Sequence, residues 1–142
     1  MTDYDHVVLD TRGDLGGLTL AALCAADAAL TVFTSDPESA LGVVRLSRFV
    51  EQQRAYENTS AVLLGAACSA WDMRGRAARQ VLETLQATGV PLMRTMVPLS
   101  RRVPSSTLDM LPVVLAAPTS PVASAYRALA AEICSTAERM LS

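Results

Sequence analysis

Short apolar runs alternate with helix-like segments along almost the whole chain, and this alternation constrains the fold more than any other feature. The runs with the composition of buried strands lie at residues 7–9, 29–34, 61–67, 92–97 and 111–115. The run at 61–67 is apolar without alternation, as expected when helices cover both sides of a sheet. The pattern therefore predicts an α/β fold, with a mostly parallel sheet flanked by helices and right-handed crossovers.

The intervals between these runs predict helices, whose ends are marked by capping residues, proline and glycine. Helices are expected at residues 18–26, after the capping box of Ser35 and Glu38, at 75–87 before Gly89, and after Ser120 and Pro121. The inward side of the last helix is expected to hold Val122, Ala125, Tyr126, Leu129 and Ile133. Residues 98–109 are expected to form a polar loop.

Composition limits the class of protein. A chain of 142 residues with 51% hydrophobic and 18% charged residues fits a single domain over residues 1–142 with a large buried core. Its apolar stretches are much shorter than the roughly 20 residues of a membrane span, and no signal-peptide pattern opens the chain. We expect a soluble, cytosolic protein that does not bind membranes. Three cysteines without a C-x-x-C spacing disfavour disulfides and zinc.

The carboxyl ends of parallel strands form the usual ligand-binding edge of such a sheet. Asp10, Ser69, Asp72 and Pro98 would all emerge at this edge. All 12 basic residues are arginine, so the chain has no lysine to grip a phosphate as a P-loop lysine does. A phosphate-binding lysine would therefore have to come from elsewhere. The net charge of −2 argues against a general positive coat, although it permits a local arginine patch.

Five segments carry a resemblance through their order and spacing. They are Tyr4-Asp5-His6-Val7-Val8-Leu9-Asp10-Thr11, Gly16-Gly17-Leu18-Thr19 with Ala25-Ala26-Asp27, residues 60–72, Val97-Pro98, and residues 118–132 with an Ala-Tyr-x-x-Leu-Ala signature. Together they resemble the ParA/MinD deviant Walker ATPases, and within them the ParA (Soj-like) partition proteins. The first segment is similar to their Walker B strand. The resemblance implies the C-terminal portion of a P-loop NTPase fold, without the N-terminal P-loop portion.

The resemblance also implies roles for individual residues. Asp10 would hold magnesium, because this ion prefers carboxylate oxygen and phosphate as ligands. The implied nucleotide-binding residues are Asp10, Thr11, Ser69, Asp72, Pro98 and Ser100. Arg74 and Arg102 match arginines that Soj-like proteins use for DNA binding without sequence preference, through contacts to phosphates. No catalytic residue is expected in this chain.

A complete member of the family would bind ATP and Mg²⁺, dimerise, coat DNA and respond to a ParB-type adaptor protein. The implied location is the cytoplasm, on the nucleoid if DNA binding is retained. We expect this chain alone not to hydrolyse ATP, because the family's glycine-rich loop, its lysines and its catalytic aspartate are missing. The sequence also departs from the family at Arg12-Gly13 in place of two prolines, at Leu99 in place of arginine, and at Asp109-Met110 in place of Tyr-Gly.

The missing P-loop strand leaves several outcomes open. In family members it lies between the Walker B strand and the strand at 29–34, so two strand edges would lack a partner. The gap could close by direct pairing, a second protomer could fill it, or the chain could be a truncated product whose N-terminal portion is absent. The expected partner is accordingly a second copy in a homodimer or a chain that supplies the P-loop half. An alternative function is a stand-alone, non-catalytic module for dimerisation or interaction. A positioning ATPase for cargo other than DNA is a further alternative.

Simpler interpretations apply to several of these residues. Asp10 could cap a turn, and Trp71 could serve packing rather than stacking on a base. His6 has no metal-binding neighbours in the sequence and is expected to be an ordinary strand-edge residue. The arginines at 74, 76, 79, 101 and 102 could be solvated side chains without a partner.

Overall fold

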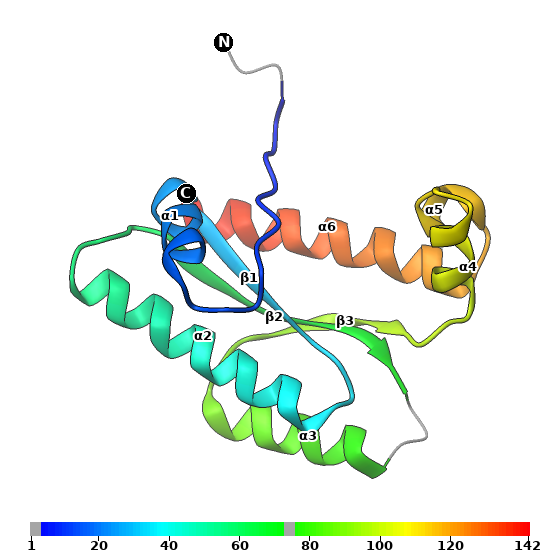
Figure 1. The fold of residues 1–142 in the computed structure, drawn as a ribbon, viewed down its shortest axis with the longest axis horizontal. Helices are drawn as coiled ribbons and strands as arrows, with labels where there is room; N and C mark the ends of the chain where they lie inside the picture. Colours follow the sequence, from blue (N-terminus) through cyan, green and yellow to red (C-terminus); the bar gives the residue numbers. More distant parts are fainter. Residues whose placement is uncertain (1–3, 73–75) are drawn as a thin grey trace.

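A parallel sheet of three strands forms the centre of the molecule. The structure, a computed structural model, describes residues 4–72 and 76–142. The strands are β1 (Ala28–Phe33), β2 (Val62–Trp71) and β3 (Leu92–Pro98), in the order β1-β2-β3. The crossovers between them are α2 (Pro37–Ala55) and α3 (Arg76–Thr88), as Figure 1 shows. The predicted α/β fold with a parallel sheet and flanking helices is confirmed.

Helices cover both sides of this sheet. In Figure 1, α2 and α3 lie below the strands, and the long helix α6 (Pro121–Leu141) lies above them. The core below is built from Phe33, Ala40, Val43, Ala66, Cys68, Trp71, Ala78, Val81 and Leu85. The core above is built from Leu64, Ala67, Met93, Val97, Val113, Val122 and Leu129. The central strand β2 contributes to both, which explains its continuous apolar sequence.

Local signals set the ends of the helices. Asp36 caps α2, because its side chain accepts a hydrogen bond from the N–H of Glu38 at 2.9 Å. The expected capping box of Ser35 is therefore wrong by one residue. Ser120 caps α6 as predicted, accepting from the N–H of Ala123 at 3.3 Å. Gly89 follows α3 with φ of +75°, the left-handed conformation that glycine adopts easily.

The expected strand at residues 7–9 is absent, so the prediction of a buried strand there is wrong. Val7 and Val8 are 78% and 88% exposed, and the segment from residue 4 to residue 15 contains no helix or strand. Among the described residues, β1 pairs only with β2. The gap beside β1 is therefore not closed by direct pairing. A strand needs a neighbour to satisfy its backbone groups, and residues 7–9 have none.

The expected strand at residues 111–115 is also wrong. Two short helices occupy this region, α4 (Arg102–Leu108) and α5 (Val113–Ala116), so part of the expected loop at 98–109 is helical as well. Pro112 begins α5 because its carbonyl accepts the N–H groups of Leu115 and Ala116. Val113 is buried against the core above the sheet, so the apolar run packs as a helical turn instead of pairing.

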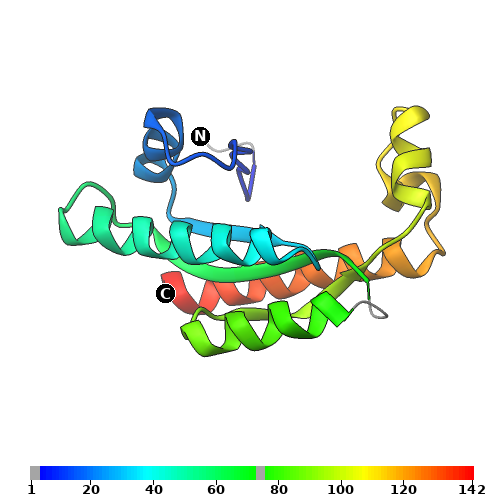
Figure 2. The ribbon, with the colours of Figure 1, turned by 60° about the horizontal axis from the view of Figure 1, so that its bottom comes forward.

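Two lobes rise from the sheet region, as Figure 2 shows. One lobe holds the N-terminal segment and α1 (Gly17–Ala25), and the other holds α4 and α5. In the ranges that the structure describes, no helix is long and apolar enough to cross a membrane.

Candidate functional site at the carboxyl edge of the sheet

The carboxyl ends of the three strands are joined to one another by hydrogen bonds. The N–H of Asp72, which follows β2, donates to Oγ of Ser35, which follows β1, at 2.8 Å. The N–H of Leu99, which follows β3, donates to the carbonyl of Trp71 at 3.0 Å. This edge is the usual ligand-binding edge of a parallel sheet. Asp72 and Pro98 therefore lie together on one rim, as the sequence predicted, and Ser69 lies two residues before the end of β2.

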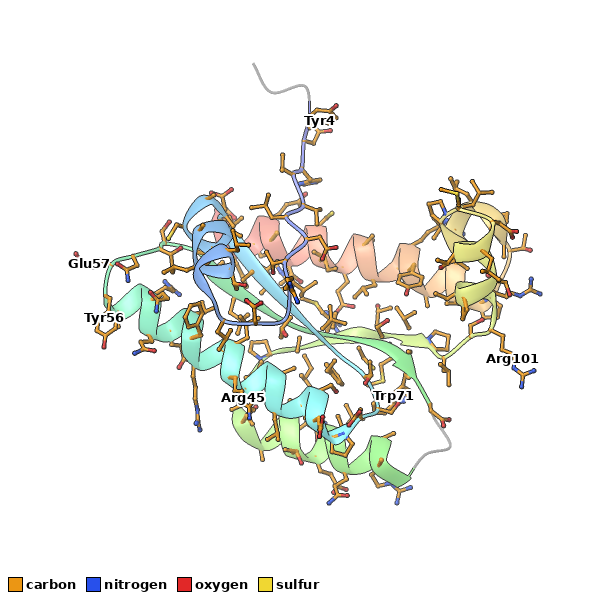
Figure 3. All side chains as sticks on the ribbon, viewed as in Figure 1. Tyr4, Arg45, Tyr56, Glu57, Trp71 and Arg101 are labelled. Atoms are coloured by element: carbon orange, nitrogen blue, oxygen red, sulfur yellow. The ribbon has the colours of Figure 1, made fainter. Side chains whose placement is uncertain are left out.

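Trp71 packs inside this rim and does not project from it. Its ring lies edge-on to Phe33, with centroids 6.4 Å apart and planes at 80°, and its side chain is only 8% exposed. Edge-to-face pairs of this kind stabilise a core beyond the burial of their area. Figure 3 shows Trp71 beside the carboxyl ends of the strands. The packing interpretation of Trp71 is confirmed.

A bulge distorts β2 at the rim. The register with β3 shifts between Cys68 and Trp71, and Ala70 has φ of +52°, which L-residues other than glycine adopt at a cost. Ser69 is half-buried beside this strained residue. Bulges and strained residues gather at functional sites, where they redirect a side chain or end a strand pairing.

The turn between β1 and α2 is fixed by a small hydrogen-bond network. Oγ of Ser39 accepts from the N–H of Thr34 at 3.0 Å and lies 2.6 Å from the carbonyl oxygen of Asp36. The carboxylate of Asp36 already occupies the N-terminus of α2. A phosphate placed there would meet this negative charge, so the turn does not supply an anion-binding helix terminus.

Asp10 and Thr11 lie in the N-terminal segment outside the sheet, and both are exposed. The sequence predicted that they lie at the end of a strand, and this prediction is wrong. The loop after them is held by Asp14, whose carbonyl accepts from Oγ1 of Thr19 at 2.7 Å and whose carboxylate accepts from the N–H of Gly16 at 3.1 Å. The loop is therefore tied to the start of α1.

The only histidine of the chain also lies in the N-terminal segment. Nε2 of His6 is 3.9 Å from Sγ of Cys134 on α6. Within residues 4–72 and 76–142, no three His, Cys, Asp or Glu side chains are grouped so that they could hold a metal ion.

The loop after β3 leads from the rim to the second lobe. Pro98 ends β3 opposite Trp71, and Oγ of Ser100 accepts from the N–H of Arg102 at 3.2 Å. Ser100 thus helps to begin α4, and Arg102 is its first residue. Arg101 and Arg102 are exposed, and Figure 3 shows Arg101 directed outward. Arg74, the other expected DNA-binding residue, lies outside the described residues.

Glu132 on α6 is a residue whose role the sequence did not predict. Its carboxylate accepts from the N–H of Arg94 at 2.7 Å and from the N–H of Thr95 at 2.9 Å. Burial raises the pKa of Glu132, but these hydrogen bonds and the charge of Arg94 outweigh it, so the pKa is lowered from its ordinary 4.5. Three residues after Leu129, Glu132 lies on the inward side of α6. In the sequence, the signal for a role of Glu132 was that its carboxylate falls on the inward side of the last expected helix.

A cavity of about 570 Å³ lies at the opposite end of the sheet. It is lined near the amino ends of β2 and β3 by Val62, Val90 and Pro91, and on α2 by Glu51 and Arg54. Ligands of parallel sheets bind at the carboxyl ends of the strands, so we assign the candidate site to the rim and not to this cavity.

Comparison with known proteins found relatives among partition proteins, although no family model matches the chain. The chain is 35% identical over 131 residues to the chromosome-partitioning ATPase Soj of Thermus thermophilus, covering 92% of this chain and 53% of that protein. It is 40% identical over 73 residues to a ParA family protein of Chlamydia pneumoniae, covering 51% of this chain and 28% of the relative. A virulence plasmid ParA family protein of Chlamydia trachomatis is 31% identical over 84 residues, or 59% of this chain and 31% of the relative.

The share of each protein that a match covers shows how much of the relative this chain corresponds to. It spans about half the length of the Thermus relative, although the match covers nearly all of the chain. The parallel sheet with flanking helices agrees with part of a P-loop NTPase-like fold. The chain is therefore a homologue of the ParA/Soj chromosome-partitioning ATPases, and it corresponds to their C-terminal portion.

Proposed function

We propose that residues 1–142 act as the C-terminal portion of a ParA-like plasmid or chromosome partition ATPase. The observation that carries this proposal is the rim on which Asp72 and Pro98 lie together, with Ser69 two residues before the end of β2, held by the bond between Asp72 and Ser35 at 2.8 Å. The match to Soj over 92% of the chain supports the same function. The complete ATPase would bind ATP and Mg²⁺, and its nucleotide would lie along this rim.

Each rim residue would serve a different part of the nucleotide. Ser69 would contact the base from the bulge of β2, and Pro98 with Ser100 would form the loop that covers it. Asp10 and Thr11 would serve the magnesium side. This requires the N-terminal segment to become a strand. A strand supplied from outside this chain between the segment and β1 would give both of them a partner.

The residues of this chain do not form a binding site for the phosphates of ATP by themselves. The chain has no lysine, and the carboxylate of Asp36 occupies the N-terminus of α2 at the rim. Mg²⁺ usually takes part of its ligands from the phosphates of a substrate, so Asp10 alone would hold it weakly. ATP hydrolysis therefore needs the P-loop half, and the chain alone is expected to be inactive.

DNA and an adaptor protein complete the proposed function. Arg102 is exposed at the start of α4, and Arg74 would add a second contact to DNA phosphates. Such binding has no sequence preference and weakens as salt is raised. The partner that stimulates the ATPase would be a ParB-type adaptor. The protein would act in the cytoplasm, on the nucleoid when DNA is bound.

A chimeric protein tests this proposal. The half of the Thermus Soj protein that this chain does not match would be joined to residues 1–142, and ATP binding would be measured by calorimetry with and without Mg²⁺. We expect Mg²⁺-dependent binding that Asp10→Asn weakens at least tenfold. Asp5→Asn is the matched control, because Asp5 is exposed in the same segment and is expected to have no effect. Equal binding by both variants would remove Asp10 from the site.

A second candidate function is a non-catalytic interaction module, either alone or with a chain that supplies the P-loop half. The observation that favours it is the edge of β1, which has no second neighbour among the described residues. An evolved module would give one defined species in sedimentation, whereas a fragment of an ATPase would aggregate. The two candidates are therefore distinguished by the behaviour of the purified chain.

A further inference from the structure

Strand β3 carries an irregularity shortly before it reaches the rim. In its pairing with β2, Leu92 lies opposite Ala66. The next pair is Met96 opposite Cys68, so β3 advances by four residues while β2 advances by two. Residues 93–95 therefore form a bulge, in which β3 holds two residues more than a regular pairing would. A bulge changes how the rest of a strand lines up with its neighbour.

The bulge keeps the side chains of β3 on their proper faces. Side chains alternate along a strand, so an odd number of extra residues would turn all the following ones to the other face. With two extra residues, Leu92 and Met96 both pack against the core below the sheet. Met93 and Val97 both belong to the core above it. Because a pairing without the two extra residues gives the same alternation, the apolar faces do not decide between the two registers.

A carboxylate on α6, the helix above the strands in Figure 1, holds the bulge. Glu132 accepts from the N–H of Arg94 at 2.7 Å and from the N–H of Thr95 at 2.9 Å, one through each oxygen. Consecutive N–H groups of a regular strand point to opposite sides, so one side chain can bind both only where the strand is distorted. Nε of Arg94 lies 4.0 Å from the same carboxylate, but that side chain is 89% exposed, so the two backbone bonds are the stronger contacts.

A second irregularity lies between this bulge and the rim. From the pair of Cys68 and Met96 to the pair of Trp71 and Pro98, β2 advances by three residues and β3 by two. Here the extra residue is in β2, in the stretch that contains Ala70 with its φ of +52°. The bulge in β3 and the bulge in β2 thus jointly determine which residue of β2 faces Pro98.

We propose that Glu132 sets the register with which β3 reaches the rim, and so positions Pro98 and the loop that begins at Leu99. The N–H of Leu99 donates to the carbonyl of Trp71 at 3.0 Å, and this bond requires the present register. Each residue by which the register slipped would move Pro98 along β2 by about 3.3 Å. The consequence for a nucleotide rests on the proposed function, in which the loop after β3 covers the base, whereas the register itself does not depend on that function.

The chain contains its own reporters of this register. Trp71 is its only tryptophan and is 8% exposed, so its fluorescence comes from the rim alone. The N–H of Leu99 reports the pairing after the bulge. The N–H of Ala66, which donates to the carbonyl of Pro91 at 2.8 Å, reports the pairing before it. Comparison of the two amides by hydrogen exchange therefore separates a slip of β3 from a general loss of stability.

Two substitutions of Glu132 test the proposal in the full chain. Glu132→Leu removes both acceptors, and Glu132→Gln keeps one. In Glu132→Leu, the protection of the Leu99 amide should fall about tenfold relative to that of Ala66, the factor that corresponds to losing one hydrogen bond to a charged group. The fall should be smaller in Glu132→Gln, and the emission of Trp71 should shift to the red in the same order. Circular dichroism would check that each variant is folded.

Leu129→Ala is the matched control for a general loss of stability. Leu129 lies three residues before Glu132 on α6 and is buried in the core above the sheet, so its truncation leaves a cavity without removing an acceptor from the bulge. This variant should not lower the protection of Leu99 relative to Ala66. Its Trp71 emission should match that of the natural sequence.

The chimera with the unmatched half of the Thermus Soj protein tests the consequence for a nucleotide. Glu132→Gln should weaken the binding of ATP by about tenfold and leave the binding of tripolyphosphate, which has no base, unchanged. A natural chimera that binds no ATP would count against the proposed function, and the Leu99 amide would still decide the register.

Three results would overturn the proposal. If both Glu132 variants keep the natural protection of Leu99 and the natural emission of Trp71, the register does not depend on the carboxylate. If Leu129→Ala causes the same changes, they follow from a loosened α6. If Glu132→Gln weakens ATP and tripolyphosphate equally in the chimera, Glu132 does not position the loop that covers the base.

Discussion

The N–H of Asp72 lies 2.8 Å from Oγ of Ser35, and this hydrogen bond fastens the carboxyl end of β2 to that of β1. Ser35 comes one residue before the cap of α2, so the bond also fixes where that helix begins relative to the rim. The rim that carries the candidate nucleotide site is therefore set by a side chain that the sequence suggested only as a helix cap.

Replacing Ser35 by alanine should loosen the rim. The N–H of Asp72 would lose this partner, and a lost hydrogen bond of this kind costs about 1 kcal/mol in the free energy of unfolding. Urea denaturation would measure the change. Ser124→Ala is the control, because Ser124 is exposed on α6 and should change stability by less than about 0.5 kcal/mol. If the two variants are equally stable, the bond does not hold the rim.

The carboxylate of Glu132 should make stability depend on acid pH. Its pKa is lowered in the folded protein, so its stabilising effect is fully present above the unfolded value and is lost as pH falls through the folded pKa. Glu132→Gln should lower the free energy of unfolding at pH 7 by about 1–3 kcal/mol, because the N–H groups of Arg94 and Thr95 lose a charged acceptor.

Denaturation at several pH values would measure this effect. The difference between the natural protein and Glu132→Gln should shrink as pH falls below 4.5, the ordinary pKa of a glutamate. Glu138→Gln is the matched control, since Glu138 is exposed on the same helix. A difference that stayed constant down to the lowest pH would mean that the charge of Glu132 has no part in the effect.

Gly65, in β2, should be the least replaceable of the glycines that the structure describes. It has φ of +139°, and an added Cβ would lie 2.5 Å from the carbonyl oxygen of Pro91. Both the contact and the backbone conformation oppose a side chain, so Gly65→Ala should destabilise by about 3 kcal/mol. Gly42→Ala, in α2 with nothing near the added atom, should instead stabilise by up to about 1 kcal/mol. Thermal melts that rank the variants in the opposite order would contradict the geometry.

Ala70 should be strained by the bulge in β2. Its φ of +52° costs a residue with a Cβ about 1–2 kcal/mol, and a β-branched residue more. Ala70→Gly should therefore leave stability unchanged or raise it slightly, because relief of strain offsets the greater freedom of glycine in the unfolded chain. Ala70→Val should lower stability by at least about 1 kcal/mol. A valine variant as stable as the glycine variant would show that the bulge can relax.

Local signals in the sequence predicted the elements that have partners within the chain. β1, β2 and β3 lie close to the expected runs, and Ser120 and Gly89 mark helix ends as expected. The strand at 7–9 was predicted from composition alone, but a strand forms only beside another strand, and composition does not show whether one is present. The apolar run at 111–115 was equally ambiguous, because a short buried run can be a strand or a helical turn.

The candidate site was only partly readable in the sequence. Ser69, Asp72 and Pro98 could be placed on one rim because parallel strands end at the same edge. The bulge at Ala70 and the bond from Asp72 to Ser35 depend on strand register, which the sequence does not encode locally. Glu132 received no predicted role, although its spacing of three residues from Leu129 put it on the buried face of α6.

The most direct test of the account is calorimetric titration of ATP with Mg²⁺ into residues 1–142 alone. We predict no binding in the micromolar range, because the chain offers no lysine and the carboxylate of Asp36 already occupies the N-terminus of α2 at the rim. Micromolar, Mg²⁺-dependent affinity for the chain alone would contradict the claim that its rim is only one side of a nucleotide site.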